Sequence, residues 1–230
     1  MEDTVENKTK KSRMILDTLK ENVTSLRDLL QDVNDERIEQ SIYRAIILFV
    51  CSGIDAVVKQ LIIDTLEPVI ERDVGAQEQL RKFAQRAIKK EQEKDCGLLA
   101  ELFTARNSRK VLIEKLKSEL AVGSLQSTEQ LLKVGSYFDI PSNSLVKRNE
   151  NENLRMAFDT RNKIVHQMDV NFESNGIEYY IHDEEIIKIS ELIEIVTERF
   201  IDEIEAILCR DITDDYKPTW YIEGDSLVIE

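Results

Sequence analysis

The chain has 230 residues, of which 42% are hydrophobic and 33% charged, and it carries a net charge of −14. This length suits one domain with its own core, or one domain with a small addition. The acidic excess disfavours non-specific adhesion to nucleic acid, because phosphates are repelled by a negative surface. Only seven Gly and three Pro interrupt the chain, which favours long helices over a strand-and-turn architecture.

Signals for export or membrane insertion are not evident in the sequence. The opening stretch MEDTVENKTKKSR is polar, with no apolar stretch behind it, so we expect a cytoplasmic protein. The longest apolar stretch, residues 45–58, is interrupted by polar residues and is too short to cross a bilayer, so we expect no membrane partner. Three cysteines without CxxC spacing predict reduced thiols, with Cys51 and Cys209 in the core.

Two long helices are predicted at the beginning of the chain. Residues 12–31 place apolar side chains three and four positions apart, which is the spacing of an amphipathic helix. Residues 37–66 are apolar on most sides, as expected for the central buried helix of a bundle. Pro68 is predicted to mark the end of this second helix, because proline disrupts helical hydrogen bonding.

Three more helices are predicted, at 76–94, 107–120 and 127–136. Ser127 is the expected N-cap of the last one, with Gln130 three residues further on. Basic residues concentrate in this part of the chain. Residues 81–117 contain eleven Lys or Arg and five Asp or Glu, so this window carries +6 and the remainder −20. The window is interpreted either as the solvated faces of two helices or as a surface that contacts a substrate.

The second half of the chain begins with a predicted loop at 141–153, rich in Pro, Ser and Asn. Helical spacing resumes in LRMAFDTRNKIVHQM, residues 154–168. Residues 177–182 are predicted to form a short strand. A long helix is expected over 183–209, with Asp183 as its N-cap.

A β-hairpin is predicted at the end of the chain, where WYIE and LVIE flank Gly224 and Asp225. The strand at 177–182 is expected to pair with it. We find no internal repeat and no Pro-rich linker, so a single domain is expected.

Familiar catalytic motifs are missing from the sequence: it has no Gly-rich phosphate loop, no GxSxG elbow and no HExxH. It also has no Cys and His cluster with metal-ligand spacing, so no metal and no cofactor are expected. Only two histidines are present. His182 lies in the strand-like segment IEYYIH, where a structural role is expected.

His166 has neighbours that suit phosphate chemistry. Asn162 precedes it by four residues and shares its face on a helix, while Arg161 needs its long side chain to reach the same place. An imidazole can act as general base or acid, and a guanidinium offers a planar fork of donors to a phosphate. These residues together suit RNA cleavage by the neighbouring 2′-hydroxyl, which requires no metal in principle.

This reaction needs one proton removed from the nucleophile and one given to the leaving oxygen. A single histidine cannot act as both the general base and the general acid in one step. A two-fold dimer that places two copies of the motif face to face would supply two histidines and two arginines in one cleft, so we expect a homodimer.

The stretch RNKIVH, residues 161–166, resembles the R-N-x-x-x-H form of the Rx4-6H signature of the HEPN superfamily. The segment IYRAIILFVCSGIDAVVKQLI is similar to the long early helix of these proteins, particularly those of the RiboL-PSP type, in which an apolar run leads to a small and then an acidic residue. Ser52 and Asp55 fill those places here. LLKVGSYFDI resembles, more loosely, the segment before the motif helix. The resemblance spans about residues 38–205.

The resemblance implies a HEPN-type helical bundle that dimerises and acts as a metal-independent endoribonuclease, leaving cyclic-phosphate ends. It implies that Arg161 and His166 are catalytic, that Asn162 orients the site and that Asp55 supports it. It also implies service as a toxin or antiphage effector, with an antitoxin or regulatory protein as a further partner. We expect one HEPN-like domain over 1–230, with its core at about 36–210 and a tail at 211–230 that holds the hairpin.

Two other function classes remain open. One is a non-catalytic HEPN module that binds RNA, a nucleotide or a protein partner, which the acidic charge favours. The other is a structural helical protein that assembles through its apolar helix at 37–66. In that last case Arg161 and His166 would be replaceable together without loss of function.

Overall fold

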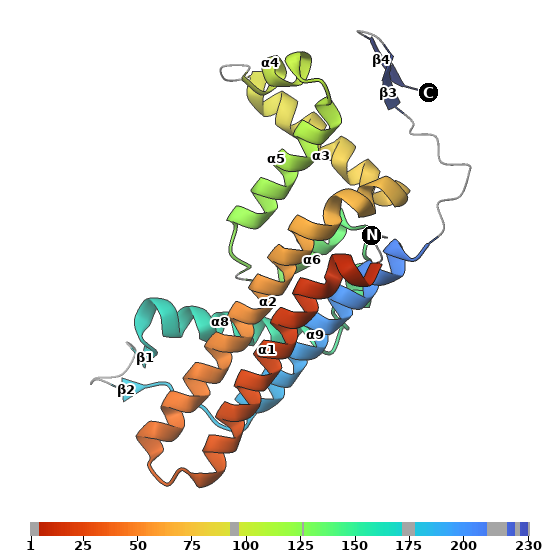
Figure 1. Ribbon diagram of the computed structural model, residues 1–230. Coiled ribbons are helices and arrows are strands. Elements are labelled where there is room, and N and C mark those ends of the chain that lie inside the picture. Colours follow the sequence, from red (N-terminus) through yellow and green to blue (C-terminus); the bar gives the residue numbers. More distant parts are fainter. Residues whose placement is uncertain are drawn as a thin grey trace.

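Helices make up nearly all of the ordered structure (Figure 1). The computed structural model describes residues 5–92, 97–125, 127–171, 178–210, 220–223 and 226–229. The helices are α1 (Val5–Asp32), α2 (Glu36–Arg72), α3 (Val74–Gln92), α4 (Gly97–Thr104), α5 (Ser108–Val122), α6 (Thr128–Tyr137), α7 (Ser142–Leu145), α8 (Asn151–Gln167) and α9 (Glu185–Leu208). The strands are β1 (Val170–Asn171), β2 (Glu178–Tyr179), β3 (Trp220–Glu223) and β4 (Ser226–Ile229). The predicted all-α class is confirmed.

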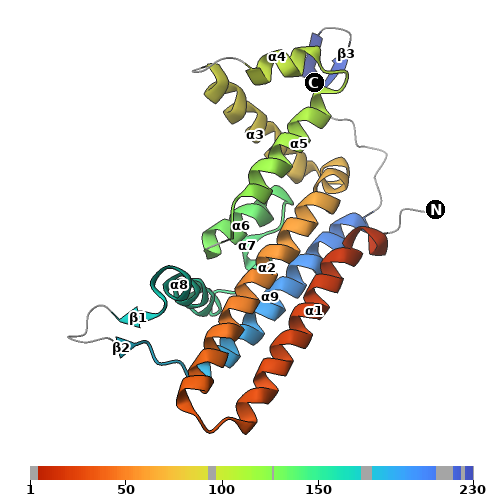
Figure 2. The ribbon, with the colours of Figure 1, turned by 60° about the vertical axis from the view of Figure 1, so that its left-hand side comes forward.

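The core is organised around α2, which lies against α1 and α9 (Figures 1 and 2). By length and composition α2 is apolar enough to cross a membrane, with a mean hydropathy of 2.1 over an 18-residue window. On these measures its apolar stretch is not too short for a bilayer, contrary to the sequence prediction. The core helix of a soluble protein passes the same test, and 56% of this window is buried inside the protein.

Pro68 does not end the second helix, contrary to the sequence prediction. It lies inside α2, which continues to Arg72. A proline in a helix interior costs about 3 kcal/mol. Val69 and Ile70, directly after it, are fully buried, and burial of each such side chain contributes about 1.5–3 kcal/mol. Packing of this last turn therefore offsets the lost hydrogen bond.

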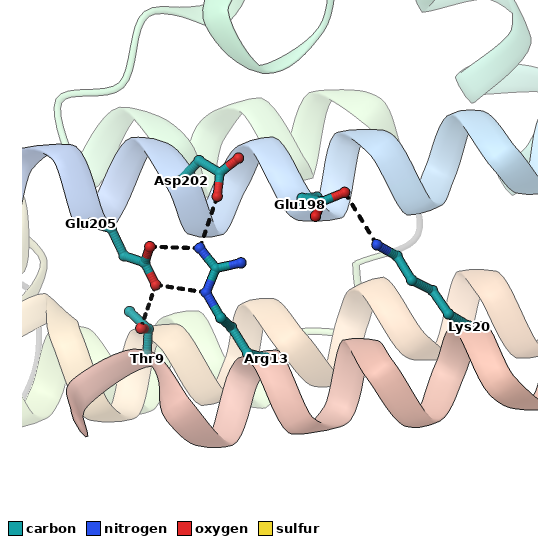
Figure 3. A network of polar contacts seen from close by, with 6 residues as sticks. All are labelled: Thr9, Arg13, Lys20, Glu198, Asp202 and Glu205. Carbon is teal, nitrogen blue, oxygen red and sulfur yellow. Dashed lines mark hydrogen bonds and ion pairs between the residues drawn. The ribbon is translucent and has the colours of Figure 1, made fainter. Parts of the chain in front are cut away.

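Ion pairs join α1 to α9 along their antiparallel contact (Figure 3). Arg13 donates from Nε to Oε1 of Glu205 at 2.8 Å and from Nη2 to Asp202 at 2.9 Å. One heptad along α1, Lys20 Nζ lies 3.1 Å from Glu198 Oε2. One heptad further, Arg27 lies 4.0 Å from Glu191, which is one heptad before Glu198, and it also donates to Glu194 at 2.9 Å. The cations of α1 and the carboxylates of α9 thus repeat with matching spacing, as at the flanks of a coiled coil.

Helices α3, α4 and α5 form an arm at one end of α2 (Figures 1 and 2). The helices predicted at 76–94 and 107–120 are α3 and α5; the short α4 between them was not predicted. The arm leads back to α6, where Ser127 accepts a hydrogen bond from the backbone N–H of Gln130 at 3.3 Å. The predicted N-cap of α6 is therefore confirmed.

The predicted β structure is only partly correct. Residues 178–179 form β2, which pairs antiparallel with β1 rather than with the C-terminal hairpin. The two strands are adjacent because α8 ends just before β1 and reverses direction there. The hairpin strands β3 and β4 do pair, with Trp220 opposite Ile229. The predicted turn residues Gly224 and Asp225 lie outside the described residues.

Further differences concern single residues and short segments. Cys51 is buried as predicted, whereas Cys209 is exposed at the C-cap of α9, where the chain leaves the core. The predicted loop at 141–153 contains α7 and the first turn of α8. The predicted N-cap of α9, Asp183, lies one residue before the actual N-cap position, Glu184. Asp183 still accepts a hydrogen bond from the backbone N–H of Glu185 at 2.8 Å, so it satisfies a first-turn donor.

We predict that Glu205→Gln lowers the free energy of unfolding by about 1 kcal/mol at pH 7. Hydrogen bonds from Arg13 hold the pKa of Glu205 below its usual 4.5. The carboxylate therefore stabilises the fold above that pH, and its contribution is lost as the pH falls through the folded-state pKa. Urea unfolding near pH 7 and at about pH 3 measures both effects.

The matched control is Glu203→Gln, on the same helix and without an ion pair among the described residues. It should change stability by less than about 0.5 kcal/mol. An equal loss for the two variants, or a loss for Glu205→Gln that persists in acid, would contradict the role given to this ion pair.

Candidate functional site

The candidate residues lie on α8, which packs across α2 and against α9 (Figure 2). Its buried face consists of Leu154, Ala157, Phe158 and Ile164. The start of the helix is fixed by a two-pronged ion pair, in which Arg199 of α9 donates to Glu150 at 2.6 and 2.9 Å. These hydrogen bonds hold the pKa of Glu150 below its usual value. The orientation of α8 is thus set before the motif begins.

Arg161 and Asn162 are brought together by this helix. Both are half-buried, and Arg161 donates from Nη1 to Oδ1 of Asn162 at 2.9 Å. Arg161 also lies near Cys51 of α2, whose thiol pKa burial raises to about 12 while the guanidinium opposes the shift. The guanidinium therefore lies at the boundary between the α2 core and the outer face of α8. The Asn162 amide oxygen thus holds the guanidinium, and the orienting role expected for this residue stays a prediction.

His166 is exposed in the last turn of α8. At 3.6 residues per turn it projects about 40° from Asn162 and about 140° from Arg161 around the helix axis. Within the described chain its imidazole makes no hydrogen bond to either residue. One copy of the motif therefore presents Asn162 and His166 on an accessible face, with the guanidinium of Arg161 drawn toward that face by Asn162.

Asp55 lies on α2 and is engaged elsewhere. Its Oδ1 accepts a hydrogen bond from the backbone N–H of Leu125 at 2.8 Å, and its Oδ2 lies 2.8 Å from Lys59 Nζ. Leu125 is in the connection between α5 and α6. Oδ1 thus fastens this connection to α2, whereas the ion pair of Oδ2 with Lys59 lies within α2. Among the contacts of the described residues, none joins Asp55 to Arg161 or His166.

A buried polar cluster fixes the turn that follows His166. Met168 and Asp169 have positive φ angles of 52° and 62°, so the chain reverses in a left-handed conformation. The Asp169 side chain is fully buried, and its Oδ2 contacts Arg44 Nε at 2.7 Å and His182 Nε2 at 2.6 Å. Its Oδ1 is also buried and has no hydrogen-bond partner in the described part of the chain.

The N-terminal half of α2 supplies the other half of this cluster. The Gln40 amide exchanges two hydrogen bonds with the backbone of His182, accepting from its N–H at 2.8 Å and donating to its carbonyl at 2.7 Å. Arg44 Nη2 also donates to the carbonyl of Tyr180 at 3.3 Å. The end of α8 and the approach to α9 are therefore both tied to α2, and His182 has the structural role expected for it.

Neither Arg44 nor Asp169 was predicted from the sequence to belong to a site. The residues of this cluster come from 40–44, 169 and 180–182, which are distant in sequence, so no local spacing connects them. The only local signal is the acidic residue three positions after His166, and such residues are common after helix ends. The cluster became visible only when the fold placed α2 beside the end of α8.

Fold and motif together define a class: an all-helical bundle that carries R-N-x-x-x-H at the C-terminal end of a helix packed across its core. The family described as RiboL-PSP-HEPN matches residues 17–206. The chain belongs to this HEPN family, as the motif and the early helix predicted. Comparisons with curated proteins and with solved structures give no match. Family membership supports a ribonuclease-type or RNA-related module.

We predict that Asp169→Asn lowers the free energy of unfolding by about 2 kcal/mol, because Arg44 loses a buried anionic partner. Asparagine tolerates the left-handed conformation, so the effect isolates the charge from the backbone. Urea unfolding measures it. The control, Asp159→Asn on the exposed face of α8, removes a carboxylate that lies 3.7 Å from Arg155 and should cost less than about 0.5 kcal/mol. Equal losses would contradict the role of the buried cluster.

Proposed function

We propose that the protein is a HEPN-type endoribonuclease that cuts RNA without a metal ion. The observation that carries the proposal is the arrangement at the end of α8, where His166 is exposed and Asn162, on the same face, holds the guanidinium of Arg161. These side chains offer a general base or acid and a phosphate-binding fork on the same end of one helix. Arg161 and His166 are the proposed catalytic residues, with Asn162 as a positioning residue.

In the proposed reaction, the imidazole of His166 takes the proton from a ribose 2′-hydroxyl. The 2′-oxygen attacks the adjacent phosphorus, and the bond from phosphorus to the 5′-oxygen breaks. The leaving 5′-oxygen receives a proton from a protonated histidine, so the products are a 2′,3′-cyclic phosphate and a 5′-hydroxyl. The Arg161 guanidinium stabilises the negative charge on the phosphorane oxygens. The nucleophile belongs to the RNA itself, so the proposed chemistry requires no metal or other cofactor.

A homodimer would complete this site. Two proton transfers need a base and an acid, whereas one motif supplies one histidine. Beside His166, the apolar side chains of Val165 and Met168 are 45% and 75% exposed, and burial of apolar surface favours association by about 25 cal/mol per Å². A two-fold contact through this end of α8 would cover them and bring two motifs together.

Control of such an activity is part of the proposal. A ribonuclease that meets cellular RNA in the cytoplasm needs restraint, which fits a toxin or antiphage effector with an antitoxin or regulatory protein as partner. Exposed apolar surface beside the motif would give such a partner a place to bind. Expression in a bacterial host should then be toxic in a manner that depends on Arg161 and His166.

The direct test is cleavage of a mixed tRNA and messenger RNA pool by purified protein in excess EDTA. We expect the wild type to cut and to leave cyclic-phosphate ends. Arg161→Ala and His166→Ala should each cut at least about 100-fold more slowly, because each removes a group that acts in the transition state. Matched controls are Arg155→Ala and Gln167→Ala, which alter exposed side chains of the same helix and should retain activity.

Two outcomes would overturn the proposed activity. Undiminished cutting by His166→Ala would assign the cleavage to another group or to a contaminant. Tight binding of RNA or a nucleotide, with no cutting by any of the proteins, would instead favour the non-catalytic HEPN module.

The proposed dimer contact at the end of α8 can be tested separately from cleavage. Val165→Glu should shift the protein to monomers in analytical ultracentrifugation and lower its specific activity at least about ten-fold, because it places a charge in the proposed contact. Val165→Leu is the apolar control and should remain dimeric and active. Wild-type specific activity should also fall on dilution, as dimers dissociate. A monomeric wild type with full activity would contradict the composite site.

A further inference from the structure

The distal end of the α3–α5 arm gathers basic side chains from segments that the chain direction brings together. Helix α3 runs outward, α4 crosses the end and α5 returns toward α2 (Figures 1 and 2). The last turn of α3, all of α4 and the first turn of α5 therefore share this end, which we call the arm tip. The exposed cations of the arm tip are Lys89, Lys90, Arg106 and Lys110.

No carboxylate of the described residues neutralises these four tip cations. Elsewhere in the arm, Arg81 pairs with Glu78 and Lys117 pairs with Glu114. Within the described ranges, none of the four tip cations forms an ion pair. Residues 89–110 hold six Lys or Arg and four Asp or Glu. In a chain with a net charge of −14 this local balance is positive, and the charges are available to a ligand.

An aromatic ring stands among these cations. Phe103 on α4 is 87% exposed, the highest fraction of any large hydrophobic side chain in the part of the chain that the structure describes. Leu98, on the same helix, is buried and holds α4 to the arm. Phe103 thus contributes almost nothing to the core, although an exposed ring of this size is unfavourable in water.

We propose that the arm tip binds single-stranded RNA, with its cations on the phosphates and Phe103 stacked on one base. Backbone-tracking cations combined with an exposed aromatic ring are the elements by which proteins hold single strands without reading sequence. This inference rests on the proposed ribonuclease function, because the arm tip would hold the same RNA that the α8 site cleaves. The arm and α8 meet different parts of the bundle (Figure 1), so an RNA would have to be long enough to reach both.

A helix-dipole role or a lipid-binding role would account for only part of the arm tip. Lys89 and Lys90 are in the last turn of α3, where cations favour the helix dipole, but that contribution is only about 0.3–1 kcal/mol and does not involve Arg106 or Phe103. An anionic lipid surface would also attract the cations. A single protruding ring, however, offers little apolar area for insertion, whereas membrane-binding helices present a whole apolar face.

The test measures binding without cleavage, so that it does not depend on catalysis. In a His166→Ala background, anisotropy of a fluorescent single-stranded oligouridylate is followed with increasing salt. The arm variant changes Lys89, Lys90, Arg106 and Lys110 to Glu. The matched control changes Lys10, Arg37, Lys133 and Lys188, all exposed and outside the arm, to Glu. Both variants then have the same net charge, and circular dichroism and thermal unfolding check their folds.

We expect the arm variant to bind at least ten-fold more weakly than its parent and the control to lose less than about three-fold. For the arm variant, the slope of log affinity against log salt concentration should be smaller in magnitude by about two to three. This is the change expected when four contacts to single-stranded phosphates are lost. Phe103→Ala should weaken binding at least about five-fold, because base stacking contributes about 1–3 kcal/mol, with no change in the salt slope.

Several outcomes would overturn the proposal. No binding by the parent, or equal losses for the arm variant and its control, would exclude a specific surface at the arm tip. Arm-dependent binding to phosphatidylserine vesicles without binding to RNA would assign the tip to lipid. When the arm substitutions are made in active protein, KM for long RNA should rise and the rate of dinucleotide cleavage should stay unchanged. Loss of cleavage for both substrates would mean that the substitutions damage the α8 site or the fold. Binding by the arm would survive even if the protein proves not to cleave RNA.

Discussion

The fold depends on the burial of α2. A helix that is apolar on most sides must be covered on most sides, and α1 and α9 cover it along its length while α5 and α8 cover further surface. This coverage explains why α8 is placed across the bundle: its inner face completes the core around Cys51. The site is a consequence of that packing, because the same helix that seals the core presents His166 on its outer side.

Polar contacts complement the apolar core by fixing where each helix ends. Asp73, between α2 and α3, accepts from the backbone N–H of Ala76 and from Arg210 beyond α9. At the other side of the molecule, Asp169 joins the end of α8 to Arg44 of α2. Apolar packing alone tolerates rotation and sliding, whereas these contacts accept only one arrangement. At both junctions the buried carboxylate is paired with an arginine from another part of the chain.

The sequence was informative where one segment determines its own structure. The helices at 107–120 and 127–136 followed from apolar spacing and from the cap at Ser127, both of which are local. The motif at 161–166 was equally local, and its place on a helix followed from the same periodicity. The family assignment rested on that motif and on the apolar run of α2.

Features that depend on distant segments escaped the sequence analysis. The continuation of α2 beyond Pro68 is decided by the core that receives Val69 and Ile70, and no local rule contains that information. Strand β1, which pairs with β2, directly follows the left-handed turn at Asp169, and the carboxylate of Asp169 contacts Arg44 of α2. The engagement of Asp55 with Leu125 is of the same kind. In each case a contact between remote residues outweighed a local preference.

The repeating charges of α1 and α9 do not by themselves fix where α1 lies along α9. The α9 carboxylates at 191, 194, 198, 202 and 205 stand about one turn apart, so a slide of one helical turn would still offer the cations of α1 a carboxylate. A slide of one heptad would move α1 by about 10 Å and leave one cation beyond the end of the series. The connection between α1 and α2 has only three residues, 33–35, which cannot absorb such a shift. The charges thus permit more than one alignment of α1 along α9, and the short connection to α2 is what excludes the longer slides.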